Sequence, residues 1–340
     1  MRFDNIWIAG TGGVLGETVP VTEAVADGSY SAEAAASTGM ISYSRSAEAP
    51  PEMAVTAGRQ AVKEAGDKGA RVDPDSLVLH SHGHFQGIDM WPAACWIARE
   101  LLGPRLNSMP MTVAAWSNGS LASLDVAAST LIARPDVPSA LITLADRFAP
   151  PSDRWYTSPG MVFGDGAAAA VVTRDTGRLR LRSLVSETDT VLEGLSRGAE
   201  PFRTAPGEQP DMRRRTREFL ATGEVSLRDV QTRSVERTRS VVGRALAEAD
   251  VAPDGIDWFV TPFVGRTLHR ESFVRHLDIA PRHSLHELGL TIGHLGPCDQ
   301  LYGLDHLLRN DLLSPGDRVL VLGTGMGFTF SAAVLTADGI

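Results

Sequence analysis

The chain has 340 residues, 43 % of them hydrophobic and 21 % charged, so it can bury a large core and fits neither a disordered nor a coiled-coil protein. Its formal net charge of −9 argues against nucleic-acid binding through phosphate neutralisation. No apolar run reaches the roughly 18 residues of a membrane span, and no charged leader precedes an apolar stretch at the start. The two cysteines, Cys95 and Cys298, do not suggest a disulfide framework, and they fit a reducing cytoplasm.

Short β-type runs alternate with alanine-rich helical stretches, as in a layered α/β protein. The first strand leads into a glycine turn near residue 10. We predict strands over residues 6–8, 77–80, 141–144, 167–172, 258–260 and 319–322. Apolar residues recur at spacings of three and four over residues 52–65, 93–102, 121–133, 232–249, 268–276 and 300–310, which predicts helices there.

A glycine turn followed by a small-residue strand occurs twice, over residues 163–172 and 325–334. This repetition predicts two similar halves, residues 1–175 and 176–340. Residues 193–222, rich in Gly, Pro, Arg and Glu, are interpreted as an insertion or cover. The basic run Arg213, Arg214 and Arg215 is better explained as a solvated helix face than as a site for an acidic partner.

Five motifs, over residues 8–13, 38–40, 113–119, 163–167 and 323–328, occur in an order and spacing that resembles the ketoacyl-ACP synthase III family and its acyltransferase relatives. The resemblance covers nearly the whole chain. It implies an α/β thiolase fold, with duplicated βαβαβ halves in a five-layer α-β-α-β-α arrangement. It also implies a homodimer whose partner helps to line the acyl pocket.

Ser117 stands where the family has its nucleophilic cysteine, at the beginning of a buried helix. A helix amino terminus stabilises developing negative charge because its N–H groups are unpaired and its dipole end is positive. The alternative is that Ser117 or Asn118 only caps the helix. The resemblance favours the nucleophile.

The family's other two catalytic residues, a histidine and an asparagine, correspond to Phe263 and His294. Without the first histidine, an enolate formed by decarboxylation loses a stabilising donor. A serine hydroxyl is also harder to ionise than a thiol by about five units or more, roughly 7 kcal/mol, and a helix end supplies about 2 kcal/mol at most. We therefore expect His294 to act as the base and Asp299 to orient it, although Asp299 also fits a helix cap.

The family's oxyanion hole maps to the backbone N–H groups of Ser117 and Met326. We expect four side chains to bind substrate: Phe263, Trp116, His84 and Phe148. The three histidines of residues 80–84 could suggest a metal site, but polar packing beside the acyl pocket is favoured because no acidic or cysteine cluster completes a ligand set.

Two further loops carry acidic residues. Residues 146–148 and 153–155 either line the substrate entrance or belong to a salt-linked surface loop, whereas Asp165 bonds N–H groups of its glycine turn.

The family's coenzyme A clamp contains a tryptophan that has no counterpart around residues 27–31, unless Tyr30 substitutes. Acyl carrier protein is therefore the favoured donor. The expected reaction moves an acyl group from a thioester through acyl-Ser117 to a hydroxyl of a natural-product scaffold such as a sugar or aminocyclitol, without decarboxylation, metal or cofactor. The alternatives are a priming synthase that selects a polyketide starter unit, and an inactive partner subunit. No nucleic acid or membrane is expected to take part.

Overall fold

Ten strands form the main sheet of the computed structural model, which describes residues 1–150, 152–174, 176–204 and 211–338. Five come from the first half of the chain: β1 (Arg2–Leu15), β4 (Leu77–Ser81), β5 (Met111–Thr112), β6 (Ser139–Asp146) and β7 (Gly166–Arg174). Five come from the second half: β8 (Leu179–Thr188), β9 (Trp258–Val260), β10 (His283–Ser284), β11 (Arg318–Gly325) and β12 (Thr329–Thr336). The two sets join where β1 pairs with β8.

The two sets of strands repeat one topology. The first runs β5-β4-β6-β7-β1 and the second β10-β9-β11-β12-β8, so each has its third, second, fourth, fifth and first strands in that order. In both sets the third, second and fourth strands are parallel to one another, and the fifth is antiparallel to the fourth and first. The division of domains at residue 175 stays a prediction, because that residue lies outside the described ranges.

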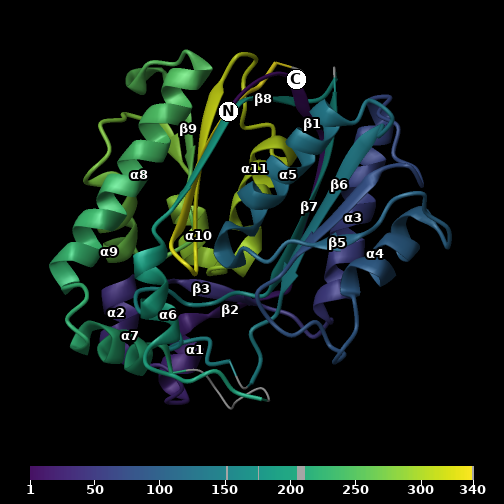
Figure 1. The fold of residues 1–340 in the computed structure, drawn as a ribbon. Coiled ribbons are helices and arrows are strands. Elements are labelled where there is room, and N and C mark those ends of the chain that lie inside the picture. Colours follow the sequence, from purple (N-terminus) through teal and green to yellow (C-terminus); the bar gives the residue numbers. More distant parts are fainter. Residues whose placement is uncertain (151, 175, 205–210, 339–340) are drawn as a thin grey trace.

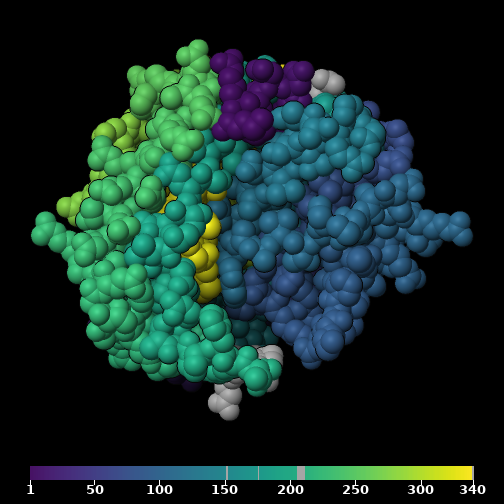
Figure 2. Space-filling view, in the orientation of Figure 1, coloured from purple at the N-terminus to yellow at the C-terminus, as the bar shows by residue number. Residues whose placement is uncertain are grey.

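Helices cover both outer faces of the sheet and fill the space between its two halves (Figure 1). The central layer contains α5 (Gly119–Ala133) and α11 (Asp299–Arg309), whose buried leucines pack with both inner faces in the largest core cluster. Outside the first half lie α3 (Pro50–Asp67) and α4 (Ala93–Leu102), and outside the second lies α8 (Leu227–Ala249). This is the predicted five-layer order. In the space-filling view the two halves meet along a seam (Figure 2).

All twelve predicted elements overlap observed ones, and β9 and α4 have the predicted bounds. The prediction that the first strand ends in a glycine turn is wrong, because β1 continues to Leu15. Its glycines instead allow α3 to approach: an added Cβ would lie 2.3 Å from Ala61 O at Gly10 and 2.0 Å from Ala57 O at Gly12. The predicted helix over residues 268–276 is a short α9 (Arg266–His269) followed by a π-helical turn, Arg270–Val274.

A small subdomain beside the main sheet was not predicted. It consists of the hairpin β2 (Glu17–Pro20) and β3 (Ser42–Arg45) with helices α1 (Val21–Ala26) and α2 (Ala32–Thr38) between its strands. Backbone bonds tie its first helix to residue 41 and residue 41 to Leu290 in α10 (His286–Ile292). The hairpin therefore lies against the second half of the chain.

The segment interpreted as a cover contains α6 (Gly194–Arg197) and α7 (Met212–Ala221), and residues 205–210 of it lie outside the described residues. Its helices share a small apolar cluster around Leu195 and Phe219. The arginine run does lie on a helix, but Arg214 and Arg215 form ion pairs with Glu200. Among the described residues, no helix combines the length and apolar character needed to cross a membrane.

Candidate functional site

Ser117 lies in a 3₁₀ turn, Trp116–Asn118, immediately before α5. Its neighbour Trp116 has a φ of +49°, a left-handed conformation that is strained for a large residue and recurs at functional sites. Gly119 lets this turn approach β4, because an added Cβ would lie 2.3 Å from Ser81 Oγ. The hydroxyl therefore stands at the positive end of a central helix.

His294 lies in the turn between α10 and α11, and its backbone is attached to the first half of the chain. Its N–H donates to Val162 O at 2.8 Å, and its carbonyl accepts from Gly164 N at 2.9 Å. Gly293 turns the chain into this position with a φ of +81°, and a Cβ there would lie 2.9 Å from Val162 O. The imidazole is 2 % exposed and is thus fixed from both halves.

The three residues expected to form a triad are in hydrogen-bonding contact. Ser117 Oγ lies 2.7 Å from His294 Nε2, and His294 Nδ1 lies 2.5 Å from Asp299 Oδ2. Because a carboxylate accepts, Nδ1 carries the proton and the Nε2 lone pair faces the Ser117 hydroxyl. This arrangement can remove a proton from an attacking oxygen.

Asp299 is fully buried, and its carboxylate receives two backbone N–H groups besides the imidazole. Phe263 N donates to Oδ2 at 2.7 Å, and Leu295 N donates to Oδ1 at 2.7 Å. Both donors precede α11, which begins at Asp299 itself. The observed bonds therefore hold the imidazole and its turn, rather than capping the helix.

The turn between β11 and β12, which carries Met326, packs directly on the turn of Ser117. A Cβ at Gly325 would lie 2.6 Å from Ala115 O and 2.9 Å from Asn118 N, so only glycine allows this approach. The backbone N–H groups of Ser117 and Met326 thus belong to two turns in contact. Their role as an oxyanion hole stays a prediction.

Aromatic side chains gather beside Ser117. The His84 ring is edge-on to Trp116 at 5.6 Å and to Phe148 at 4.5 Å. Phe148 stacks on Phe163 at 4.2 Å, and Phe163 lies 5.5 Å from the His294 ring. Three of the four expected substrate-binding residues, Trp116, His84 and Phe148, therefore surround the candidate site.

Phe263 differs from that expectation. Its side chain is fully buried in the main core, facing Gly289, where an added Cβ would lie 2.8 Å from its ring. Its backbone N–H alone reaches the site, through Asp299. A contact made by a backbone N–H leaves no residue signature in a sequence.

The histidines of residues 80–84 serve separate polar contacts. His80 is fully buried between Thr143 Oγ1 at 3.0 Å and Gln86 Oε1 at 3.1 Å, and burial lowers its pKa to about 4. Burial, with smaller effects of His294 and His82, also lowers the pKa of His84 to about 4. Within the described ranges, no three His, Cys, Asp or Glu side chains are grouped as a metal site.

Asp146 does not lie in a surface loop, because its side chain is fully buried. That residues 146–148 and 153–155 line the substrate entrance stays a prediction. The carboxylate of Asp146 accepts from Gly83 N and His84 N, each at 2.9 Å, and so anchors the loop that carries the His84 ring. Burial raises its pKa to about 7. The signal in the sequence for this buried position is that Asp146 ends the apolar run that forms β6.

Two other predictions concern the loops around the site. Tyr30 cannot serve as an adenine platform, because it is 2 % exposed and stacks on Trp155 at 4.8 Å. Asp165 accepts from backbone N–H groups, but these are Ser46 N and Phe148 N, each at 2.9 Å, which belong to two other loops and not to the glycine turn of Asp165 as predicted.

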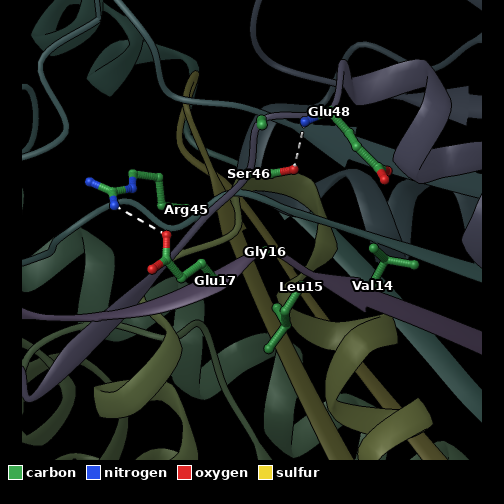
Figure 3. Close-up of a pocket in the computed structure, with 8 residues that line it drawn as sticks. Val14, Leu15, Gly16, Glu17, Arg45, Ser46 and Glu48 are labelled. Atoms are coloured by element: carbon green, nitrogen blue, oxygen red, sulfur yellow. Dashed lines mark hydrogen bonds and ion pairs between the residues drawn. The ribbon is translucent and has the colours of Figure 1, made fainter.

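A surface hollow of about 490 Å³ lies where β1 ends and the loop after β3 begins (Figure 3). The ion pair of Glu17 and Arg45, at 3.2 Å, lies on its wall. None of the predicted site residues lines it, so it is not the candidate active site.

Comparison with known proteins identifies the family of this chain. Residues 111–190 match the family 3-oxoacyl-[acyl-carrier-protein] synthase III, and residues 246–337 match its C-terminal family. The solved structure of the acyltransferase ChlB3 is 34 % identical, with a TM-score of 0.89 over 99 % of this chain and 98 % of that one. The chain belongs to the synthase III-like family of the thiolase superfamily.

Two other relatives share less sequence identity with this chain. Beta-ketoacyl-[acyl-carrier-protein] synthase III 3 of Streptomyces coelicolor is 27 % identical over 299 residues, which cover 84 % of this chain and 82 % of that protein. The synthase III structure from Aquifex aeolicus is 18 % identical, with a TM-score of 0.75 over 97 % of this chain and 99 % of that one, and it shows the fold alone. The protein is therefore an acyltransferase-type enzyme.

Proposed function

We propose that this synthase III-like enzyme is an O-acyltransferase that forms an acyl ester on Ser117 and transfers the acyl group to a hydroxyl of a natural-product scaffold, such as a sugar or aminocyclitol. The observation that carries the proposal is the hydrogen-bonded chain from Ser117 through His294 to Asp299, with distances of 2.7 and 2.5 Å. The acyltransferase ChlB3, at 34 % identity, supports transfer as the reaction class.

The reaction has two balanced half-reactions. In the first, His294 Nε2 takes the hydroxyl proton as Ser117 Oγ attacks the thioester carbonyl, the C–S bond breaks, and the proton passes to the leaving thiolate. In the second, His294 Nε2 takes the proton of the acceptor hydroxyl as that oxygen attacks the ester carbonyl. The bond between the acyl carbon and Ser117 Oγ breaks, and the proton passes from His294 to Oγ. The protein supplies the base, the orientation and the oxyanion donors in both.

A serine nucleophile explains why a base is built here. The hydroxyl is harder to ionise than a thiol by roughly 7 kcal/mol, and the α5 end supplies about 2 kcal/mol at most. An imidazole aimed at the Ser117 hydroxyl and held by a buried carboxylate supplies the difference. An inactive subunit has no need of this arrangement.

The donor is an acyl thioester, and we propose that acyl carrier protein presents it. Burial of Tyr30 supports this choice over coenzyme A, because no aromatic face is offered in that segment for an adenine ring. Both cysteines are unpaired, which supports a reducing, cytoplasmic setting.

We also propose a homodimer that forms beside β5. This short strand lies at an edge of the sheet, and exposed apolar side chains occur in the neighbouring loops. Phe85 is 60 % exposed and Met109 71 % exposed, and a free strand edge with such neighbours favours association.

Intact-protein mass spectrometry tests the acyl ester. The enzyme is incubated with a panel of acyl N-acetylcysteamine thioesters and acylated carrier proteins, and the adduct is located by peptide mapping. One acyl mass should appear on the peptide containing Ser117, and Ser117→Ala should lose the adduct and turnover. Cys95→Ser is the matched control and should label normally. Labelling at Cys95 or Cys298 in place of Ser117 would overturn the assignment.

A further inference from the structure

The residue after the candidate nucleophile, Asn118, makes contacts that the proposed reaction does not yet use. Its side chain is 3 % exposed, and its amide Nδ2 donates to Thr329 Oγ1 at 3.1 Å and to Ser331 Oγ at 2.9 Å. Both acceptors lie on β12, directly after the turn that carries Met326. Asn118 therefore links the nucleophile turn of the first half to the last hairpin of the second.

The other end of the Asn118 amide has no partner among the described residues. Oδ1 is buried and unbonded beside Gly323, where an added Cβ would lie 2.3 Å from it. A buried polar atom without a partner costs about 1–3 kcal/mol. A small apolar residue would pack there without this cost, so the two Nδ2 bonds point to a function rather than to stability.

The turn that Asn118 holds is strained and carries one of the proposed oxyanion donors. Trp116 has a φ of +49°, and such conformations persist only where surrounding contacts enforce them. The turn that carries Met326 packs against the same residue, because a Cβ added at Gly325 would lie only 2.9 Å from Asn118 N. The two bonds to β12 thus tie the turn of Ser117 to the hairpin that carries Met326.

We propose that Asn118 is a positioning residue that keeps the backbone N–H groups of Ser117 and Met326 aimed at the tetrahedral oxyanion. The inference rests on the proposed acyl-Ser117 chemistry. Loss of one oxyanion donor costs about 10²–10³ in kcat, and the range of productive donor distances is only about 0.4 Å wide, so a small rotation of either turn is sufficient. The Ser117 to His294 contact does not pass through Asn118, so the base remains intact.

Asn118→Leu tests the proposal, because leucine is similar in size and donates no hydrogen bond. With an acyl N-acetylcysteamine thioester that labels wild type, kcat should fall about 10²-fold while KM changes less than about threefold. The affinity for a trifluoromethyl ketone analogue, which forms a tetrahedral adduct with serine, should fall by the same factor. The shape of the pH profile should not change. Asn310→Leu, at an exposed asparagine at the end of α11, is the matched control and should behave as wild type.

A second variant keeps the proposal testable if Asn118→Leu does not fold. Thr329→Val combined with Ser331→Ala removes both acceptors, should reproduce the loss in kcat, and should not add to Asn118→Leu when combined with it. Wild-type kcat in both variants, or a loss of kcat without a matching loss of ketone affinity, would overturn the proposal. Ser117→Ala is run alongside: if it retains turnover, the acyl-serine reaction itself is refuted, whereas failure at Asn118 alone leaves that reaction standing.

Discussion

Replacing Asp299 by asparagine exchanges one carboxylate oxygen for an NH₂ group in a fully buried site where three donors converge. The new NH₂ must face a donor in either orientation. Facing Leu295 N, it leaves that N–H unpaired and keeps an oxygen toward His294. Facing His294, it leaves Phe263 N unpaired and makes Nδ1 an acceptor, so that Nε2 carries its proton toward Ser117 and cannot act as a base.

The two orientations bracket the expected loss. With the tautomer preserved, a charge-assisted bond becomes a neutral one, a difference of about 1.4 kcal/mol or tenfold in kcat. With the tautomer reversed, the loss seen in triads is about 10⁴-fold. We therefore expect Asp299→Asn to lower kcat between about 10- and 10⁴-fold with little change in KM, and to lower the free energy of unfolding by about 1–3 kcal/mol.

Stopped-flow measurement of thiol release from an acyl N-acetylcysteamine thioester gives the acylation rate, and urea denaturation gives the free energy of unfolding. Asp305→Asn is the matched control, because it makes the same change in α11 at a carboxylate paired with Arg309. It should leave kcat unchanged. If Asp299→Asn turns over at a near-normal rate, Asp299 is structural and the triad hypothesis is wrong.

Two further predictions concern the loop beside Ser117. Because burial raises the pKa of Asp146 to about 7, wild type should lose stability as the pH rises from about 4 to about 7, by up to about 4 kcal/mol relative to Asp146→Asn in denaturation measurements; parallel pH curves would contradict this. His84→Gln should lower kcat/KM about fivefold, because an aromatic contact is lost. Because burial lowers the pKa of His84 to about 4, the pH dependence of kcat/KM should keep its shape above about pH 5. Loss of one limb of that pH profile near neutral pH would show that His84 titrates there.

The helices and strands could be predicted from their periodicity, which indicates a layered α/β protein. The five-layer order, and the placing of Ser117 and His294 at the family positions, came from the resemblance carried by the order and spacing of the five motifs. Because a serine hydroxyl needs a general base, His294, with the carboxylate of Asp299 five residues later, is then the candidate. The catalytic roles of the three stay predictions.

Features decided by close packing between distant segments could not be predicted. The glycines of β1 read as a turn in sequence, yet Ala57 and Ala61 of α3 require them within a strand. Tyr30 is buried by Trp155, far away along the chain. Sequence periodicity reports which face of an element is apolar, but not which neighbour will cover it.

The absence of decarboxylative condensation is the last prediction, and it follows from Phe263. Loss of carbon dioxide from a malonyl thioester leaves an enolate that needs donors, each worth about 10²–10³ in rate. The Phe263 ring is fully buried, its N–H is committed to Asp299, and the lone pair of His294 Nε2 faces Ser117 and accepts rather than donates. An acyl-serine ester is also a less reactive acyl store than a thioester.

We therefore expect carbon dioxide release to be at least about 10²-fold slower than ester formation. Acylated enzyme is given malonyl carrier protein, with trapping of carbon dioxide and a search for a ketoacyl product, and then polyol and aminocyclitol acceptors under the same conditions. Ser117→Ala measures background decarboxylation, so that only the difference counts as condensation. A hydroxyl acceptor needs from the site only a proton acceptor and an oxyanion hole, which the observed geometry of His294 and the paired turns can supply. Efficient ketoacyl formation, with no ester from any acceptor, would refute this reasoning and favour the priming synthase.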